Sequence, residues 1–292
     1  MTQKSEYKRR QELFQKLMFG VMRLSATSVI IIMIIIIGDI VIQGYPAISI
    51  DFITKMPVNQ MTEGGILPCI YGTAALVSLA LLFAVPLGVA AAVYLTEYAS
   101  ESKIKMIAEQ AVNNLAGTPS VIFGLFGLAL FIKYLGIPMS LLTASLTMGL
   151  LIVPVIIRTS QEALLAVPKD YRDASYALGA TQWETIRRVI LPAAFSGMMT
   201  GIIISIGRAA GETAPILFTG AVYYYPRLPD SILSPFMALP YHLFVMATES
   251  MNPELTRPIQ YGTALILLII VFSMNLTAFG IRRHYKRKNS II

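Results

Sequence analysis

The 292-residue chain has very few of the residues that carry most metal and covalent chemistry. It contains a single cysteine, Cys69, and only two histidines, His242 and His284. A lone cysteine excludes an intramolecular disulfide and a cysteine-rich metal site. The chain also lacks a zinc-ligand spacing, a Walker A loop and a Gly-x-Ser-x-Gly nucleophile elbow. We therefore expect no covalent catalysis, no metal site and no cofactor.

Charge is also scarce, while apolar residues are abundant. Only 13% of the residues are charged and 55% are hydrophobic, and the mean hydropathy is +0.67. These values exclude a soluble domain and predict an all-α membrane protein. A helix needs about 20 apolar residues to cross the hydrocarbon layer. Six stretches are long enough, at about residues 19–43, 66–95, 111–135, 137–157, 193–222 and 258–281.

The apolar stretch 19–43 is longer than the core of a secretory signal, and no cleavage site of small residues follows it. We therefore expect it to be retained as a transmembrane helix, preceded by a polar, basic segment at 1–18. The other five spans belong to one unit over residues 64–281, and a basic tail follows at 282–292. No second domain is evident.

Lysine and arginine fall mainly on one side of these six spans. Most of the 23 basic residues lie in the segments 1–18, 103–105, 158–188 and 282–288, and few lie in the intervening loops. Basic loops stay in the cytoplasm, so we expect a protein of the cell membrane with both termini on the cytoplasmic side. The net charge of +7 then follows from membrane topology and contact with anionic lipid, and it does not indicate nucleic-acid binding.

Arg208 and Glu212 interrupt the apolar stretch 193–222 and are its only charged residues. A charge at bilayer depth costs at least about 2.5 kcal/mol, so such residues pair or line a polar path. Four residues apart on a helix, the two side chains share a face. One interpretation is a structural ion pair, and the other is part of a pathway for a charged solute. Arg158 is a weaker candidate, as an interface anchor or a pathway contact.

The segment 158–192 is long for a connection between two spans. Pro168 precedes a helix that Gly179 is expected to end. Thr181 and Glu184 form a capping box for a second helix, which we expect Pro192 to terminate. Small residues in the following span, at Gly197, Gly201 and Gly207, predict close packing against another helix, which we assign to a paired subunit.

This segment resembles the inner loop of the membrane subunits of ATP-binding-cassette importers. That family has Glu-Ala-Ala, three residues, Gly, nine residues, Ile, one residue and Leu-Pro. The chain has Asp173, Ala174, Ser175, Gly179, Val189, Leu191 and Pro192 at the same spacing. The resemblance implies a six-helix type I importer fold, in which this loop forms coupling helices that dock on an ATPase.

Within the importers, the run Arg208-Ala-Ala-Gly-Glu212-Thr213 resembles an element of the phosphate-specific permeases. The continuation Ala214-Pro215 and the run 64–73 are similar to their A-type subunit. The resemblance implies a C-type permease subunit as heterodimer partner, an ATPase dimer below, a phosphate-binding protein outside and ATP hydrolysis on the ATPase. It covers about residues 64–281.

An arginine suits this transport because its planar guanidinium can engage two phosphate oxygens. Glu212 would weaken the site enough for release, or accept a hydrogen bond from a phosphate hydroxyl. The sequence therefore predicts import of inorganic phosphate by alternating access, with Arg208, Glu212 and Arg158 along the pathway. Import of sulfate, molybdate or tungstate is an alternative, as is a membrane signalling or scaffold role.

Overall fold

The computed structural model describes residues 2–61, 63–249 and 253–289. Nearly all the regular structure is helical; the described part contains one small antiparallel sheet, in which β1 (Pro57–Val58) pairs with β2 (Glu63–Gly64). The predicted all-α class is therefore confirmed. The last residues of the predicted basic tail, 290–292, lie outside the described residues.

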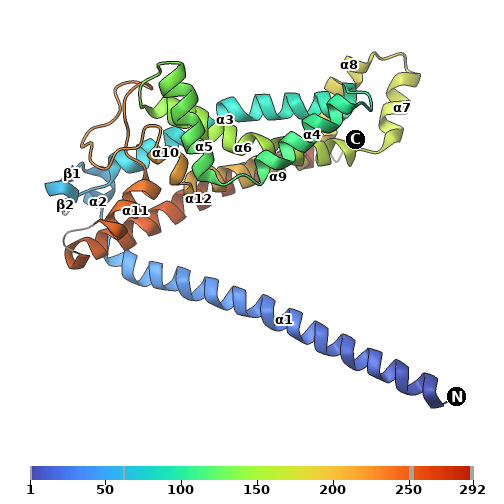
Figure 1. The fold of residues 1–292 in the computed structure, drawn as a ribbon, viewed down its shortest axis with the longest axis horizontal. Helices are drawn as coiled ribbons and strands as arrows, with labels where there is room; N and C mark the ends of the chain where they lie inside the picture. Colours follow the sequence, from blue (N-terminus) through green and yellow to red (C-terminus); the bar gives the residue numbers. More distant parts are fainter. Residues whose placement is uncertain (1, 62, 250–252, 290–292) are drawn as a thin grey trace.

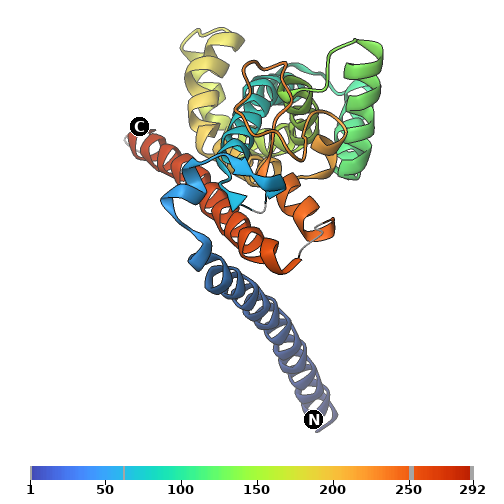
Figure 2. The same ribbon diagram turned by 90° about the vertical axis from the view of Figure 1, so that its left-hand side faces the viewer.

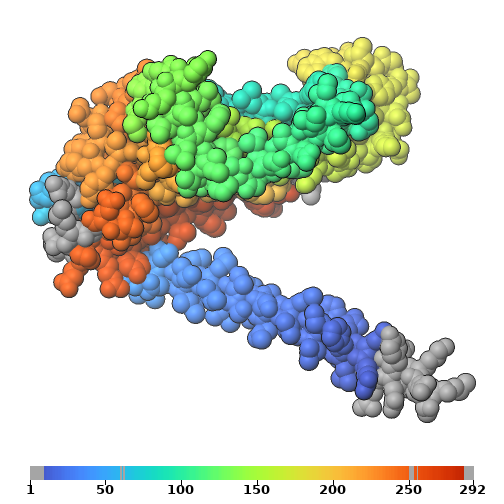
Figure 3. Space-filling view, in the orientation of Figure 1, coloured from blue at the N-terminus to red at the C-terminus, as the bar shows by residue number. Residues whose placement is uncertain are grey.

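Helix α1 (Thr2–Gly44) is a single continuous helix, so the polar segment 1–18 and the apolar stretch 19–43 are not separated by a break. It diverges from the rest of the chain (Figures 1 and 2), and the space-filling view shows it standing clear of the body (Figure 3). Its apolar span is exposed throughout. Only its C-terminal end packs closely, where Gly44 lies against Tyr261 and Leu265 of α12 (Pro253–Asn289).

Two parallel helices, α3 (Leu67–Val93) and α6 (Leu141–Leu165), form the largest helix contact in the body. A wide π-helical turn, η3 (Tyr94–Tyr98), extends α3 at its C-terminal end. Gly88 of α3 packs closely on Ile156 of α6. Around this pair lies an apolar core that also draws on α9 (Leu191–Gly211) and α12.

The predicted third span is broken. Helix α4 (Lys103–Ala116) is followed by α5 (Ser120–Gly127) and the π-helical η4 (Leu128–Tyr134), and the two parts meet at a bend of 104°. Pro119 explains the break, because a proline disfavours helical geometry in the residue before it. Counting the bent pair as one, the described residues hold the six spans that the sequence predicts.

The chain crosses the body alternately in opposite directions. As a result, the start of α1, the end of α12 and the inner loop that follows α6 at residue 166 lie toward one end of the molecule, and the sheet lies at the other (Figure 1). The loop contains α7 (Lys169–Ala177), α8 (Gln182–Thr185) and the π-helical η5 (Ile186–Ile190). We call its end the inner end and the sheet end the outer end.

Short elements close the outer end. They are the 3-10 turns η1 (Tyr45–Ala47) and η2 (Asn59–Met61), and the helices α2 (Ile50–Thr54) and α11 (Leu239–Thr248). The short helix α10 (Ala214–Leu217) packs against α5 within the bundle. The chain before α11 is irregular, and the helix begins only at Leu239. Burial lowers the pKa of His242 in α11 to about 4, so this side chain is a neutral part of the core.

Candidate functional site

Arg208 and Glu212 form an ion pair at the end of α9. The guanidinium Nε of Arg208 donates to Oε1 of Glu212 over 3.4 Å. Both side chains are partly accessible in the isolated subunit, at 31% and 21%. The predicted pairing is therefore present, at the end of a helix rather than within one.

The extent predicted for this span, 193–222, is wrong. The helix ends at Gly211, and Glu212 has an extended backbone with φ −77° and ψ 133°. Pro215 explains the end, because it lacks the N–H that would bond to residue 211 and its ring would clash with that carbonyl. The pair therefore sits where a helix stops inside the bundle, and its backbone lies next to irregular chain.

Packing against α6 places the pair near the middle of the bundle. A Cβ on Gly197 would meet Ala163 of α6, and one on Gly201 would meet Thr159. The two helices are antiparallel, so extending this register puts Arg208 opposite about residue 152 at 1.5 Å per residue. That position is close to the centre of α6, which spans Leu141–Leu165.

The register against α12 gives the same depth. The rings of Phe195 and Tyr285 lie 4.5 Å apart, and Nδ2 of Asn275 lies 3.8 Å from the place of a Cβ on Gly207. Arg208 is thus level with about residue 274 by helical rise. The apolar span of this part of α12 runs from Thr256 to Tyr285. The ion pair therefore lies within about one helical turn of its midpoint.

The guanidinium of Arg208 has donors to spare. Within the described residues, its Nε is engaged by Glu212 and its two NH₂ groups make no hydrogen bond. An arginine carries five N–H donors in a planar fork, which suits two oxygens of one oxyanion. An anion held at this depth would exchange its hydrating water molecules for charge-assisted hydrogen bonds to the guanidinium. The site can therefore bind an oxyanion without first breaking the pair with Glu212.

Two further polar groups near this depth have a buried atom without a partner in the described structure. They are Oγ of Ser205, one turn before Arg208, and Oδ1 of Asn275 beside Gly207. A buried polar atom without a hydrogen bond is costly, so such atoms often bond to water or a ligand. Sequence reasoning missed Asn275, although an amide within the apolar span 258–281 is a readable signal.

Arg158 is well inside α6, which continues to Leu165, and not at the inner end of the span as the sequence suggests. Its Nη2 donates to the backbone carbonyl of Glu109 in α4 over 3.1 Å, and its Nη1 donates to Gln161 over 3.2 Å. Its Nε is buried without a partner. Arg158 thus holds the exposed helix α4 against α6, and it does not contact Arg208 in this structure.

The small residues of α9 pack within the chain. Gly197 and Gly201 are too close to Ala163 and Thr159 of α6 to accommodate a Cβ without a shift. Our assignment of this surface to a paired subunit is therefore wrong at these positions. The glycines allow α6 and α9 to approach closely between the ion pair and the inner end.

The inner loop has most of the predicted local structure. Helix α7 ends before Gly179, whose φ of +83° lies in the left-handed region that favours glycine. The Thr181–Glu184 capping box is present. Asp173 and Ala174 are exposed, whereas Ser175 is buried and its hydroxyl hydrogen-bonds to Thr185 over 2.8 Å. Ser175 therefore holds the two loop helices together instead of facing outwards.

The second loop helix does not end at Pro192. The chain runs helically from Gln182 to Gly211, and Pro192 sits in the first turn of α9 after the π-helical η5. A proline is tolerated in a first turn, and the wide turn before it absorbs the missing hydrogen bond. Leu191 is partly buried and Pro192 is exposed. The loop therefore continues rigidly into the helix that carries Arg208.

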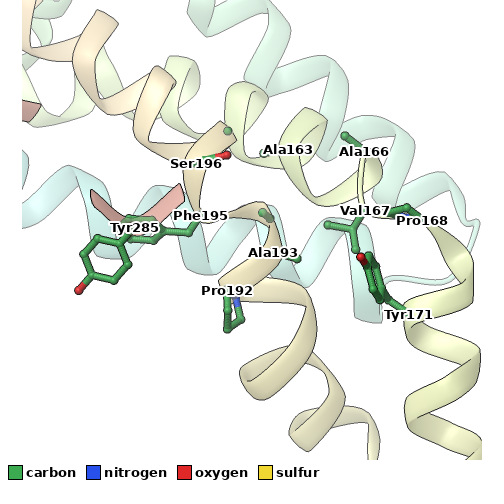
Figure 4. Close-up of a pocket in the computed structure, with 12 residues that line it drawn as sticks. Ala163, Ala166, Val167, Pro168, Tyr171, Pro192, Ala193, Phe195, Ser196 and Tyr285 are labelled. Carbon is green, nitrogen blue, oxygen red and sulfur yellow. The ribbon is translucent and has the colours of Figure 1, made fainter. Parts of the chain in front are cut away.

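A cavity of about 390 Å³ lies beside this loop, between the end of α6, α7 and the start of α9. Figure 4 shows Tyr171 and Tyr285 on opposite sides of it, with Pro192 between them. The lining is mainly apolar. The described residues hold no group of three or more His, Cys, Asp or Glu side chains that could bind a metal ion.

The profile of a family described as "Binding-protein-dependent transport system inner membrane component" matches residues 84–291. The chain belongs to this family. The permease is 30% identical over 280 residues to the probable ABC transporter permease protein YqgI of Bacillus subtilis, covering 92% of this chain and 95% of that protein. It is 39% identical over 224 residues to the phosphate transport system permease protein PstA 1 of Mycobacterium tuberculosis, covering 76% and 72%.

The permease also resembles solved structures. It matches a chain of a bacterial ABC transporter involved in the import of the acidic polysaccharide alginate with a TM-score of 0.60, covering 94% of this chain and 99% of that one. At 13% identity, this likeness shows the fold alone. The type I importer permease fold is confirmed.

The family also fixes the general role of the chain. It is a multi-pass inner membrane subunit of an importer, not an enzyme. An ATPase and a substrate-binding protein are the partners that membership of this family implies.

Proposed function

We propose that the permease is the A-type subunit of an importer that carries inorganic phosphate across the inner membrane by alternating access. The observation that carries this proposal is the Arg208–Glu212 pair at mid-depth, with the two NH₂ groups of Arg208 free to bind an oxyanion. Similarity to a phosphate transport permease over 76% of the chain supports the same substrate. Phosphate near neutral pH is an anion that needs such donors in place of water.

In this proposal a C-type permease forms the other half of the pathway. An ATPase dimer sits below the two permeases and docks on this chain at the inner loop, through the exposed Asp173 and Ala174, with Gly179, Leu191 and Pro192 setting the shape of the loop. A phosphate-binding protein docks on the outer end. The exposed apolar side chains of α4, including Ile104 and Ile107, suit contact with the second permease. Arg158 holds α4 at this surface and lies towards the exit from the Arg208 site.

The inner end is assigned to the cytoplasm. Both termini and the inner loop lie at this end (Figure 1), and it carries the basic segments that the positive-inside rule places in the cytoplasm. An ATPase dimer below the loop would therefore have access to cytoplasmic ATP.

The decisive experiment is reconstitution of the complex with its co-purifying partners in liposomes. The binding protein loaded with phosphate is supplied on the side of the membrane that faces the outer end of the permease. It is expected to raise ATP hydrolysis several-fold, and the phosphate is expected to be transported. Sulfate or molybdate, offered with their own binding proteins, should do neither. Stimulation by one of these oxyanions alone would replace phosphate as the substrate. Co-purification without transport of any oxyanion would favour the signalling or scaffold role.

Glu212 is expected to contribute to the choice between phosphate and sulfate. At neutral pH phosphate still carries a hydroxyl that can donate to a carboxylate, and sulfate does not. Glu212→Gln retains the size of the side chain and an oxygen that can accept, but it removes the charge that raises such a hydrogen bond from about 0.5–1.5 to about 1.5–3 kcal/mol. We expect the ratio of phosphate to sulfate uptake to fall about tenfold. An unchanged ratio would show that selectivity lies elsewhere, such as in the binding protein.

A further inference from the structure

Arg172 joins three parts of the inner end through one side chain. Its Nη2 donates to Oε1 of Glu97 over 2.6 Å, and its Nε donates to Oε2 of the same carboxylate over 3.4 Å. Its Nη1 and Nη2 also donate to the backbone carbonyls of Val167 and Leu164, over 2.9 and 3.0 Å. The guanidinium thus links α7 to the end of α6 and to η3, the inner extension of α3.

This contact is largely withdrawn from solvent. The side chains of Arg172 and Glu97 are only 18% and 8% exposed, whereas Glu101, the carboxylate of the neighbouring ion pair, is 92% exposed. Gln182 adds a fourth element, because its Nε2 donates to the backbone carbonyl of Glu97 over 2.7 Å. A bidentate arginine–carboxylate pair has a fixed geometry as well as strength. We call Glu97, Arg172 and Gln182 the inner clamp.

Covalent connection explains why the clamp matters. The inner loop follows α6 directly and continues into α9, so both helices are joined to it by the chain itself. Helix α3 has no direct chain connection to the loop and is joined to it by non-covalent contacts. Among the described residues, the inner clamp supplies the hydrogen bonds between η3 and the loop. On the opposite side, a cavity of about 390 Å³ lies between α7 and the start of α9, so these two helices do not pack fully against each other there (Figure 4). The side-chain contacts of Arg172 therefore hold α7 on the side of α3 and α6.

We propose that the inner clamp couples movement of the ATPase-docking loop to α3, so that α3, α6 and α9 move as one body around the Arg208 site. Glu97 and Arg172 are positioning residues in this proposal, which rests on the proposed function of the chain as an importer subunit. Without the clamp, α3 would follow the loop only through apolar packing, on α6 and around Leu95, and movement of the loop would reach α3 only in part. ATP would then be hydrolysed without the full change of access at the anion site.

The test compares substrate transported per ATP hydrolysed in reconstituted complexes. The double variant Glu97→Gln/Arg172→Gln removes both charges together, which avoids leaving one buried charge unpaired. We expect this ratio to fall at least fivefold, with hydrolysis no longer responding to the loaded binding protein. Arg172→Lys, which keeps the charge but not the fork, should give an intermediate ratio. Glu101→Gln is the matched control, because Glu101 is one turn away and its side chain is 92% exposed.

An assembled double variant with the ratio of the unmodified complex would overturn the proposal. Failure of the double variant to assemble would also count against it, since the clamp would then serve folding rather than coupling. The proposed substrate is tested separately by the unmodified complex. If sulfate or molybdate stimulates that complex instead, the phosphate assignment fails, and the clamp is judged on the ratio measured with the active oxyanion.

Discussion

Arg208→Gln is expected to reduce uptake by the reconstituted importer at least about 100-fold. The substitution removes two or more charge-assisted hydrogen bonds to the anion, each worth about 1.5–3 kcal/mol, and every 1.4 kcal/mol is about tenfold. It also leaves Glu212 without its cationic partner at mid-depth, where a lone carboxylate repels an anion. Uptake of labelled phosphate at fixed loading of the binding protein measures the effect.

Two controls separate binding from structure. Arg208→Lys preserves the charge without the planar fork, so we expect a smaller loss of about tenfold. Arg23→Gln makes the same change on an exposed side chain of α1 and should leave uptake close to that of the unmodified complex. Full uptake by Arg208→Lys would favour an ion pair that only stabilises the fold. Full uptake by Arg208→Gln would remove the site from the pathway.

Gly72→Ala is expected to loosen the outer end of the permease. The backbone carbonyl of Met237 occupies the place where a Cβ would lie, and Cδ2 of Phe236 lies 2.9 Å from that place. Next to it, Thr73 accepts a hydrogen bond from the backbone N–H of Leu239 over 2.8 Å. Because a backbone atom cannot move away as an exposed side chain can, the methyl group must push the segment before α11 off α3.

Overpacking of this kind costs about 1–3 kcal/mol, and more where the backbone is involved. We expect the midpoint of thermal unfolding in detergent to fall by at least about 5 °C. Gly280→Ala is the matched control, because nothing lies within 4 Å of its Cβ position in α12. That variant should be unchanged or slightly more stable, since alanine favours a helix. Equal midpoints for the two variants would contradict this account of the outer end.

Local signals predicted much of the inner loop. Gly179 and the Thr181–Glu184 box depend on residues within a few positions of one another, and the structure has both. The six spans follow from apolar length in the same way. The pairing of Arg208 with Glu212 is also a local event, since the two residues are four apart.

The errors arose where apolar composition hid a backbone constraint. The stretch 193–222 remains apolar beyond Gly211, but Pro215 prevents the helix from continuing. At Pro192 the error is the opposite one. The proline is expected to end a helix, but the helix continues through it because the wide turn η5 before it accommodates the proline. A proline therefore ends a helix in one place and not in the other, and its neighbours decide which.

Contacts distant in the sequence could not be predicted at all. Glu97 and Arg172 are 75 residues apart, and no local sequence pattern around either residue indicates that the two are in contact. The same holds for Asn275 beside Gly207, and for Gly201 against α6 rather than another subunit. Only the three-dimensional path of the chain brings these residues together.

The isolation of α1 bears on how the permease is made. Its isoleucine-rich surface is exposed along the whole apolar span, so this helix requires no contact with later helices to become stable in lipid. Isoleucine favours insertion by a few tenths of a kcal/mol per residue, about 0.3–0.6. During synthesis, α1 can therefore enter the membrane alone and commit the orientation before α3 emerges. The charged clamp and the Arg208 site are assembled afterwards, within a frame whose direction is already set.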